Sequence, residues 1–409
     1  MSAIKNATIT VLPVNDAPVA QNKSGISAHT HMSVTGINAN LLNGVTDADI
    51  GVNGCNPAFA VASITASTGG SVSNVNLGAG TFDFSPAPGF TGTALVNYTI
   101  SDNGCPTPGA TSAAATISIT VSGPVIWFVD DTAAGGGNGT LASPFTTLAS
   151  ADAVDANNHR IFLFSGTYTS GFTLNIGEWL IGQGVTGTTF DAVFGINPPT
   201  GTIARPTING PRPTLGGMIV VSSNSVTRGM NINPSVATRG LTNNGILATG
   251  VSVSEVSVTT SNSAAVDLNA SADGNFSFSS LSVNGGANGI LIQNTGANFN
   301  FTVTGSGTTP GSGGTIQNTT NRGASFISTR NISLSNMNFT NTATVAGAPC
   351  GSAAVVGANT GCNAAIHLDT VNTAAFNQLS ITTSGQQGIN GIDVTNFTLS
   401  SSTLSGLGN

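Results

Sequence analysis

The chain has 409 residues, of which only 6% are charged, and its formal net charge is −7. A nucleic-acid-binding domain needs a basic surface, and nine Lys plus Arg residues in the whole chain do not supply one. The composition therefore excludes DNA or RNA as partners, and 39% hydrophobic residues exclude a disordered chain. We also expect no membrane insertion, because the sequence has no run of eighteen or more apolar residues.

Small residues dominate the sequence. Glycine alone accounts for 53 positions, and Ser, Thr and Asn are common. These residue types are poor helix formers but suit strands and tight turns. The composition therefore predicts an all-β protein, and at roughly 150 residues per domain the length predicts two or three units.

The N-terminal third of the chain has the pattern of a β-sandwich. Residues 1–12 alternate polar and apolar side chains, and the same pattern returns at 115–122, so we interpret 1–12 as the last strand of a preceding repeat. Between them, short alternating runs separated by turn residues predict a sandwich over residues 13–123. The expected internal strands are 59–64, 71–75, 81–84 and 95–100.

Four motifs in this region carry a resemblance. They are Val14-Asn15-Asp16-Ala17-Pro18-Val19-Ala20, Asp47-Ala48-Asp49, Phe82-Asp83-Phe84-Ser85-Pro86 with Gly89-Phe90-Thr91-Gly92, and Tyr98-Thr99-Ile100-Ser101-Asp102. They resemble the cadherin-like and tandem Ig-like repeats of giant bacterial surface proteins. The resemblance implies an extracellular or bacterial cell-surface location.

In such repeats, acidic residues at domain junctions hold calcium. The resemblance implies a calcium site formed by Asp16, Asp47, Asp49 and Asp102. The Asp47-Ala48-Asp49 motif places two hard oxygen ligands in one loop, as Ca²⁺ requires. The alternative is that these aspartates are turn residues that bond to their own backbone. We expect no cofactor other than calcium.

The four cysteines fall into two local pairs beside turn residues: Cys55 with Cys105, and Cys350 with Cys362. Neither pair has the spacing of a metal site, and no histidine lies near enough in sequence to complete one. We therefore expect two disulfides and an oxidising compartment, with four buried free thiols as the alternative.

From residue 126 the pattern changes. A strand at 126–131 is followed by a glycine-rich loop, and Ser143 and Pro144 then predict a helix over 144–157. Serine is favoured at the N-cap and proline at the first helical position.

Three stretches of this block carry a second resemblance: Leu141-Ala142-Ser143-Pro144-Phe145, Ser165-Gly166-Thr167-Tyr168 and Leu180-Ile181-Gly182-Gln183-Gly184. They resemble the opening segment of right-handed parallel β-helix proteins of the pectate-lyase-like group. The resemblance implies that 124–184 is a capping segment whose helix closes the open end of the β-helix.

A repeated spacing, apolar-x-apolar-x-x-apolar-x-apolar, predicts the same architecture from the residues alone. Its five copies begin at Leu174, Val251, Phe276, Ile332 and Ala374. Each copy predicts two short strands with inward apolar side chains, joined by a bend. With a third strand before several copies, the repeat predicts coils of roughly 20 to 26 residues and one parallel β-helix over 124–409.

Two other features concern the C-terminal part of the predicted β-helix. The Gly- and Ala-rich segment 343–362 interrupts the repeat, so we expect a lateral loop closed by the second cysteine pair. The sequence stops at Asn409 without a capping pattern, from which we expect a truncated, longer protein.

Extended β-helices often cleave acidic polysaccharides, either with paired carboxylates or with a basic residue beside a carboxylate. Asp267, Asp369 and Asp393 share one outward position in their coils, and His367 lies on the same face as Asp369. We expect Asp369 and Asp393 on adjacent coils, so His367, Asp369 and Asp393 form the best catalytic candidate. The alternative is isolated polar residues on a solvated face. The nearest bases in sequence are Arg322 and Arg330.

Two weaker patterns suggest other kinds of site. His29 and His31 alternate as metal ligands do, although alternate histidines near a terminus more often form solvated surface. The threonine pairs 259–260 and 382–383 occupy matching places in their repeats, as in an ice-binding face, but the other copies interrupt the row.

These patterns favour a fragment of a large secreted or cell-surface bacterial adhesin or structural filament protein. We expect it to be non-enzymatic, with the β-helix as a rod that presents surfaces for adhesion or assembly. Expected partners are a carbohydrate, a cell-surface receptor or like subunits. The alternative is a carbohydrate-active β-helix, either a polysaccharide lyase or a glycoside hydrolase.

Overall fold

The computed structural model describes residues 12–348 and 361–408. The described chain is all-β and divides into two compact units. One unit extends to Val125 and also includes Ile196–Ala204, and the other comprises Ile126–Gly195 and the residues from Arg205 onward. Residues 1–11, in which we expect a strand of a preceding repeat, lie outside the described part.

The first unit is a sandwich of two sheets. The order of the four-stranded sheet is β1 (Lys23–His29), β7 (Ala115–Ser122), β6 (Gly92–Asp102) and β3 (Phe59–Thr68). The order of the three-stranded sheet is β2 (Val34–Asn38), β5 (Thr81–Pro86) and β4 (Gly70–Asn76). All pairs are antiparallel except β1 with β7, which is parallel. Each internal strand expected from the sequence is present.

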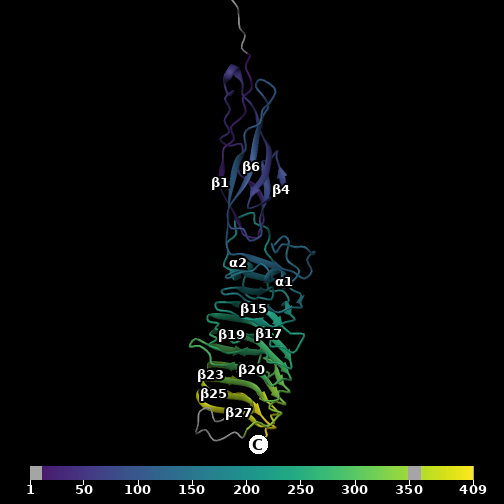
Figure 1. Cartoon of the computed structure of the whole chain (residues 1–409), viewed down its shortest axis with the longest axis vertical. Coiled ribbons are helices and arrows are strands. Elements are labelled where there is room, and N and C mark those ends of the chain that lie inside the picture. Colours follow the sequence, from purple (N-terminus) through teal and green to yellow (C-terminus); the bar gives the residue numbers. More distant parts are fainter. Residues whose placement is uncertain (1–11, 349–360, 409) are drawn as a thin grey trace, which may run out of the picture. The chain divides into compact units, whose positions relative to one another are not determined.

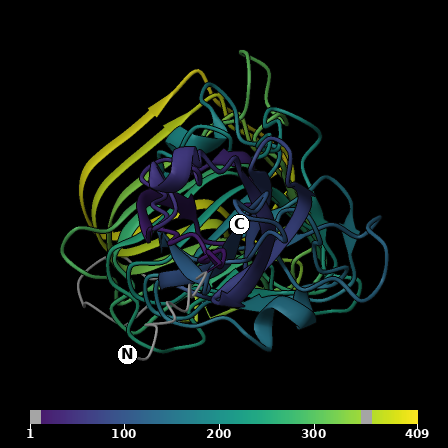
Figure 2. The same ribbon diagram turned by 90° about the horizontal axis from the view of Figure 1, so that it is seen from above.

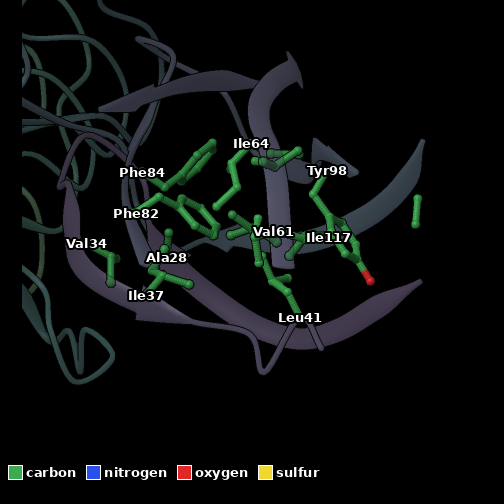
Figure 3. Packing of buried hydrophobic residues seen from close by; sticks show 14 of the residues in the cluster. Ala28, Val34, Ile37, Leu41, Val61, Ile64, Phe82, Phe84, Tyr98 and Ile117 are labelled. Atoms are coloured by element: carbon green, nitrogen blue, oxygen red, sulfur yellow. The ribbon is translucent and has the colours of Figure 1, made fainter. Parts of the chain in front are cut away.

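Alternation of side chains builds the core between the sheets. In β6 every second residue, including Tyr98 and Ile100, is fully buried, because successive strand side chains point to opposite faces. Phe82 and Phe84 enter the same core from β5 (Figure 3). The Tyr98 hydroxyl donates to the Gln21 carbonyl, which satisfies the single polar group that this side chain brings into the core.

Residues 196–204 add to the edge of β2. The Thr35 amide donates to the Gly201 carbonyl at 2.9 Å, and the Ile203 amide donates to the Ser33 carbonyl at 2.9 Å. This segment falls within the range 124–409 that the sequence analysis gave to the β-helix, yet it packs with the sandwich. It covers an edge that would otherwise offer unpaired backbone groups to another chain.

The expected bond between Cys55 and Cys105 is confirmed, with an S–S distance of 2.07 Å. Cys55 follows a short 3-10 helix, η1 (Val52–Gly54), and Cys105 follows β6, so the bond joins two loops. Cys362 is buried, and none of the cysteines in the described part is a free thiol. Cys350 lies outside the described residues, as does most of the expected lateral loop.

The second unit is a parallel β-helix. Its strands pair in parallel with strands of the neighbouring coils, which gives the stack in the lower part of Figure 1 and the superposed strands of Figure 2. The strands are β8 (Ile126–Val129), β9 (Arg160–Leu163), β10 (Thr167–Tyr168), β11 (Phe172–Thr173), β12 (Trp179–Gly182), β13 (Thr214–Leu215), β14 (Ile219–Val220), β15 (Val226–Ile232), β16 (Leu241–Thr242), β17 (Val251–Ser261), β18 (Val266–Leu268), β19 (Gly274–Asn284), β20 (Asn288–Gln293), β21 (Asn300–Val303), β22 (Thr315–Gln317), β23 (Arg322–Ser335), β24 (Asn338–Thr340), β25 (Ala364–Asn377), β26 (Ser380–Ile381), β27 (Gln387–Ser400) and β28 (Thr403–Leu404).

Three of the five repeat copies stack in register. Phe276 pairs with Phe301, Phe301 with Ile332, and Ile332 with Ala374, so the first apolar positions of the last three copies form one buried column. The copy at Val251 is offset, because Val253 rather than Val251 pairs with Phe276. In the copy at Leu174, Ile176 is 52% exposed instead of buried, so only part of that copy is a core element.

Two short helices lie in the opening coils, and the first lies within the helix expected at 144–157 but covers only part of that range. Helix α1 (Leu148–Asp152) begins after Thr147, whose hydroxyl accepts from the Ser150 amide at 3.2 Å. Pro144 is not helical, because the next residue, Phe145, exchanges backbone hydrogen bonds with Phe128 and Asp130 and is therefore extended. The prediction of the helix start and of its length was wrong.

The helix missed by the sequence analysis is α2 (Phe190–Phe194), capped by Thr189. Phe190 stacks on Phe128 of β8 at 5.9 Å between ring centroids and contacts Phe162 of β9 at 5.1 Å. Phe194 is also buried against Phe162. An aromatic cluster on α2 therefore packs on the first strands of the β-helix.

Candidate functional site

A polar groove of about 370 Å³ lies where the three longest strands of the β-helix bend. Strands β23, β25 and β27 each contribute residues to it. The lining residues are Thr295, Ser328, Thr329, Arg330, Thr370, Val371, Asn372, Asp393 and Thr395. The groove thus combines hydroxyl, amide, guanidinium and carboxylate groups with a single apolar lining residue.

Left-handed bends in neighbouring coils form this groove. Ser328, Thr370 and Asp393 have φ angles of 48°, 57° and 50°, and the strand register on both sides places them at equivalent positions of three successive coils. Thr370 is the unusual member, because a β-branched residue rarely adopts a positive φ and pays about 1–3 kcal/mol for it. Two positions further along the strands, the paired residues Arg330, Asn372 and Thr395 also line the groove.

The groove has one charge of each sign. Arg330 donates through Nη1 to the Ala297 carbonyl at 3.2 Å. Asp393 is exposed, and no described residue bonds to its carboxylate. Fixed donors and acceptors with no net charge suit a polyhydroxylated ligand, whose hydroxyl groups both donate and accept.

His367 and Asp369 do not reach the groove. His367 is completely buried, and Asp369 is 5% exposed. Burial and the nearby Arg322 lower the pKa of His367 to about 4, so the imidazole is neutral at neutral pH. Neither residue therefore lies on the solvated face that the sequence analysis considered.

Arg322 is the basic residue beside this buried pair. Its Nε donates to the Cys362 carbonyl at 3.1 Å, and its Nη1 donates to the Ser325 hydroxyl at 3.0 Å. Burial lowers the pKa of Arg322, and the Asp369 carboxylate opposes that effect. The sequence offered no sign of this arrangement, because Arg322 and Asp369 come from different coils.

The expected common register of the three aspartates is wrong. Asp267 pairs with Leu291, Leu291 with Ser325, and Ser325 with His367. The position equivalent to Asp267 is therefore occupied by His367 and not by Asp369. Asp369 pairs with Ile392, so Asp393 is one position further along. Asp267 itself forms an ion pair with Arg239 at 2.8 Å. The candidate catalytic trio is therefore divided, with Asp393 in the groove and the other two residues buried.

Two acids outside the predicted sites interact in the opening coils. Asp155, after α1, and Glu178, before β12, interact through their side chains, and each has one buried oxygen without a hydrogen-bond partner among the described residues. Burial and, to a smaller extent, Asp155 raise the pKa of Glu178 to about 9. No sequence pattern marks this pair, because each residue lies in a loop of a different coil.

Of the neighbouring acids Asp130 and Asp131, Asp130 makes a turn contact, whereas Asp131 bonds to a residue 36 positions away in the sequence. Asp130 accepts from the Thr132 amide at 2.9 Å, and Asp131 accepts from the Thr167 amide at 2.8 Å.

Of the four aspartates expected to hold calcium, Asp47, Asp49 and Asp102 accept hydrogen bonds from backbone amides, and Asp16 supplies one of these amides. Asp49 accepts from the Asp16 amide at 2.7 Å, and the Asp49 amide donates to Asp47 at 2.8 Å. Asp102 accepts from the amides of Gly104 and Ala110. Within residues 12–348 and 361–408, no three acidic, His or Cys side chains are grouped as a metal site requires. The turn interpretation fits these contacts.

His29 and His31 are buried rather than solvated, with exposures of 4% and 1%. The His29 Nδ1 atom contacts the Thr30 carbonyl, and His31 Nε2 accepts from the Gly89 amide. The two threonine pairs also fail to form one row, because Thr260 is paired with Val283 rather than with another threonine.

No helix in the described part of the chain is long and apolar enough to cross a membrane. A search of curated proteins and a search of solved structures each found no match to this chain. A family model does match the sandwich: residues 14–122 are identified as a cadherin-like domain.

Proposed function

We propose that this chain is part of an extracellular, adhesin-type protein of a bacterial surface, in which the β-helix binds carbohydrate through the groove around Arg330 and Asp393. The cadherin-like domain and the Cys55–Cys105 bond support the extracellular part of the proposal, because disulfides persist in oxidising compartments. The stacked coils support a stiff carrier, since every internal coil is hydrogen-bonded on both sides.

The observation that carries the binding proposal is the polar groove itself. Its threonine hydroxyls, the Asn372 amide, the Arg330 guanidinium and the Asp393 carboxylate offer the donors and acceptors that sugar hydroxyls need. Among the residues that line the groove, Asp393 is the sole carboxylate. Glycoside hydrolysis normally uses two carboxylates across the scissile bond. The groove therefore favours binding over cleavage.

A glycan array probed with the intact chain tests this proposal. We expect a restricted set of glycans to bind, and the Arg330→Gln, Asp393→Asn double variant to lose at least tenfold in affinity. The matched control is Arg239→Gln, Asp267→Asn, which removes another Arg and Asp pair from the same β-helix. Equal losses in both variants, or an array without any bound glycan, would contradict the proposal.

Salt provides an independent check. Because the groove carries balanced charge, long-range electrostatic attraction contributes little to binding. We expect the affinity for the selected glycan to change less than threefold between 50 mM and 500 mM salt. A steep decrease would indicate a charged surface elsewhere on the chain.

A further inference from the structure

Two carboxyl groups meet in the opening coils of the β-helix, far from the groove in sequence. Asp155 lies in the loop after α1, and Glu178 lies in the turn that precedes β12. Glu178 is completely buried, and its side chain interacts with that of Asp155. A hydrogen bond between two carboxyl groups requires a proton on one of them, since ionised carboxylates only accept.

The Asn175 side chain also interacts with Asp155, but one oxygen of each carboxyl has no donor in the described part of the chain. Glu178 Oε2 accepts from the Asn175 amide at 2.8 Å. Glu178 Oε1 and Asp155 Oδ2 are both buried and have no donor among the described residues. One proton between these two oxygens satisfies both of them. Without it, two like charges would face each other away from water, which is strongly unfavourable.

The charged and titratable neighbours do not replace that proton. Asp152 adds further negative charge, which opposes ionisation of the pair. Burial lowers the pKa of His159, so its ring is neutral at neutral pH, and its Nδ1 accepts from Trp127 Nε1 at 3.1 Å. The Arg160 guanidinium lies over the Trp179 ring at 4.2 Å, and no ion pair joins it to either carboxyl in the described part.

We propose that Asp155 and Glu178 share a single proton and form a pH-operated lock, which holds the loop 153–159 against the turn before β12. With the proton in place, the two segments are joined by the shared hydrogen bond. Loss of the proton leaves two facing carboxylates, whose repulsion separates the loop from the turn. The lock is therefore closed in acidic and neutral solution and opens in alkaline solution.

The direction of this switch follows from the burial of Glu178. The pKa of Glu178 is raised to about 9, mainly by burial, and that of Asp155 is also raised by burial. A group whose pKa is higher in the folded state stabilises that state at low pH and loses this contribution as pH rises through the folded value. Opening is therefore expected around pH 9.

Tryptophan fluorescence reports on this site alone. The chain has two tryptophans, and both belong to the cluster: Trp127 bonds to His159, and Trp179 follows Glu178 directly. We expect the emission of the intact chain to change between pH 7.5 and 10 with the steepness of a single proton. Ionisation of tyrosine contributes little in this range, because burial raises the pKa values of Tyr98 and Tyr168.

Two variants separate a shared proton from other causes. Glu178→Gln keeps an acceptor for the Asn175 amide and removes the titrating group, so the transition near pH 9 should disappear while the protein stays folded. Asp155→Asn gives Glu178 an amide donor in place of a negative neighbour. The pH midpoint of the fluorescence transition should therefore decrease by at least one unit. Asp393→Asn, an exposed carboxylate in the groove, should leave the transition unchanged.

Three results would overturn the proposal. The first is a wild-type emission spectrum that is constant from pH 7.5 to 10, and the second is a transition that persists in Glu178→Gln. The third is recovery of the neutral-pH spectrum on adding Ca²⁺ or Mg²⁺ at pH 9.5, because that would make the pair a cation site instead of a proton lock.

Discussion

The side-chain amide of Asn390 contacts Nδ1 of His367 at 3.0 Å across two adjacent coils. With the amide as donor, the neutral imidazole carries its hydrogen on Nε2, which is buried and has no acceptor among the described residues. The ring is thus an acceptor in a hydrogen-bonded ladder, not a proton donor to an external substrate. This geometry explains why His367 does not support the catalytic alternative.

The first prediction concerns acid stability. Burial lowers the pKa of His367 from 6.5 to about 4, so the unfolded chain binds more protons than the folded chain between these values. Folded-state stability should therefore decrease as pH falls from 6.5 to 4, by about 3 kcal/mol from this residue. His367→Gln, which still accepts from Asn390, should remove that part of the slope. Urea unfolding of both proteins at pH 7 and pH 4.5 measures it, and equal slopes would refute the assignment.

The second prediction concerns a ladder of asparagines on the β-helix. Asn318 donates to Asn284 at 2.7 Å and accepts from Asn341 at 2.6 Å. Asn318 also has a φ of 59°, a conformation that glycine adopts without strain. We expect Asn318→Gly to lower the free energy of unfolding by about 1–2 kcal/mol, because two hydrogen bonds are lost. Asn318→Ala should lower it by about 1 kcal/mol more, because alanine is strained at this φ angle. Equal costs in urea unfolding would show that backbone conformation contributes nothing here.

The third prediction concerns the Cys55–Cys105 bond, which closes a loop of 50 residues in the sandwich. Loop-closure entropy for this length corresponds to about 4 kcal/mol of stabilisation. The Cys55→Ser, Cys105→Ser double variant should therefore lower the melting temperature of the sandwich. Calorimetry should show the β-helix transition in its original place. A shift of both transitions by the same amount would contradict an effect confined to this domain.

The fourth prediction concerns the aromatic column in the β-helix core. Phe301 is fully buried and packs between Phe278 at 5.6 Å and Phe326 at 6.0 Å. Phe301→Ala leaves a cavity between coils and should lower the free energy of unfolding by about 3–5 kcal/mol. Phe301→Leu fills much of that cavity and should lower the free energy of unfolding by less. Chemical denaturation of the three proteins gives the comparison. A cost below about 1 kcal/mol for the alanine variant would mean that the coils collapse onto the cavity.

Much of the architecture was predictable because it depends on strong, local signals. The alternation in β6 and β7 and the spacing in the copies at Phe276, Ile332 and Ala374 place apolar side chains inward whatever their neighbours are. The offset copy at Val251 and the start of α1 were not predictable in this way. Both depend on pairing with another segment, as when Phe145 is held extended by Phe128.

The candidate sites were predicted less well, for a related reason. Outward polar residues carry no periodic signal, so the separation of Asp393 from Asp369 and the meeting of Asp155 with Glu178 follow from the register between coils. That register depends on loops of different length, such as the segment 196–204 that leaves the β-helix and packs on the sandwich.

The amino-acid sequence by itself determined the all-β class, the two kinds of unit, the first disulfide and the inward faces of the coils, because hydrophobic burial acts on each short segment separately. Only the tertiary structure decided which polar groups meet. A carboxyl such as Glu178 acquires its chemistry from the charges and the water that its distant neighbours supply or exclude, and these are set when the coils stack.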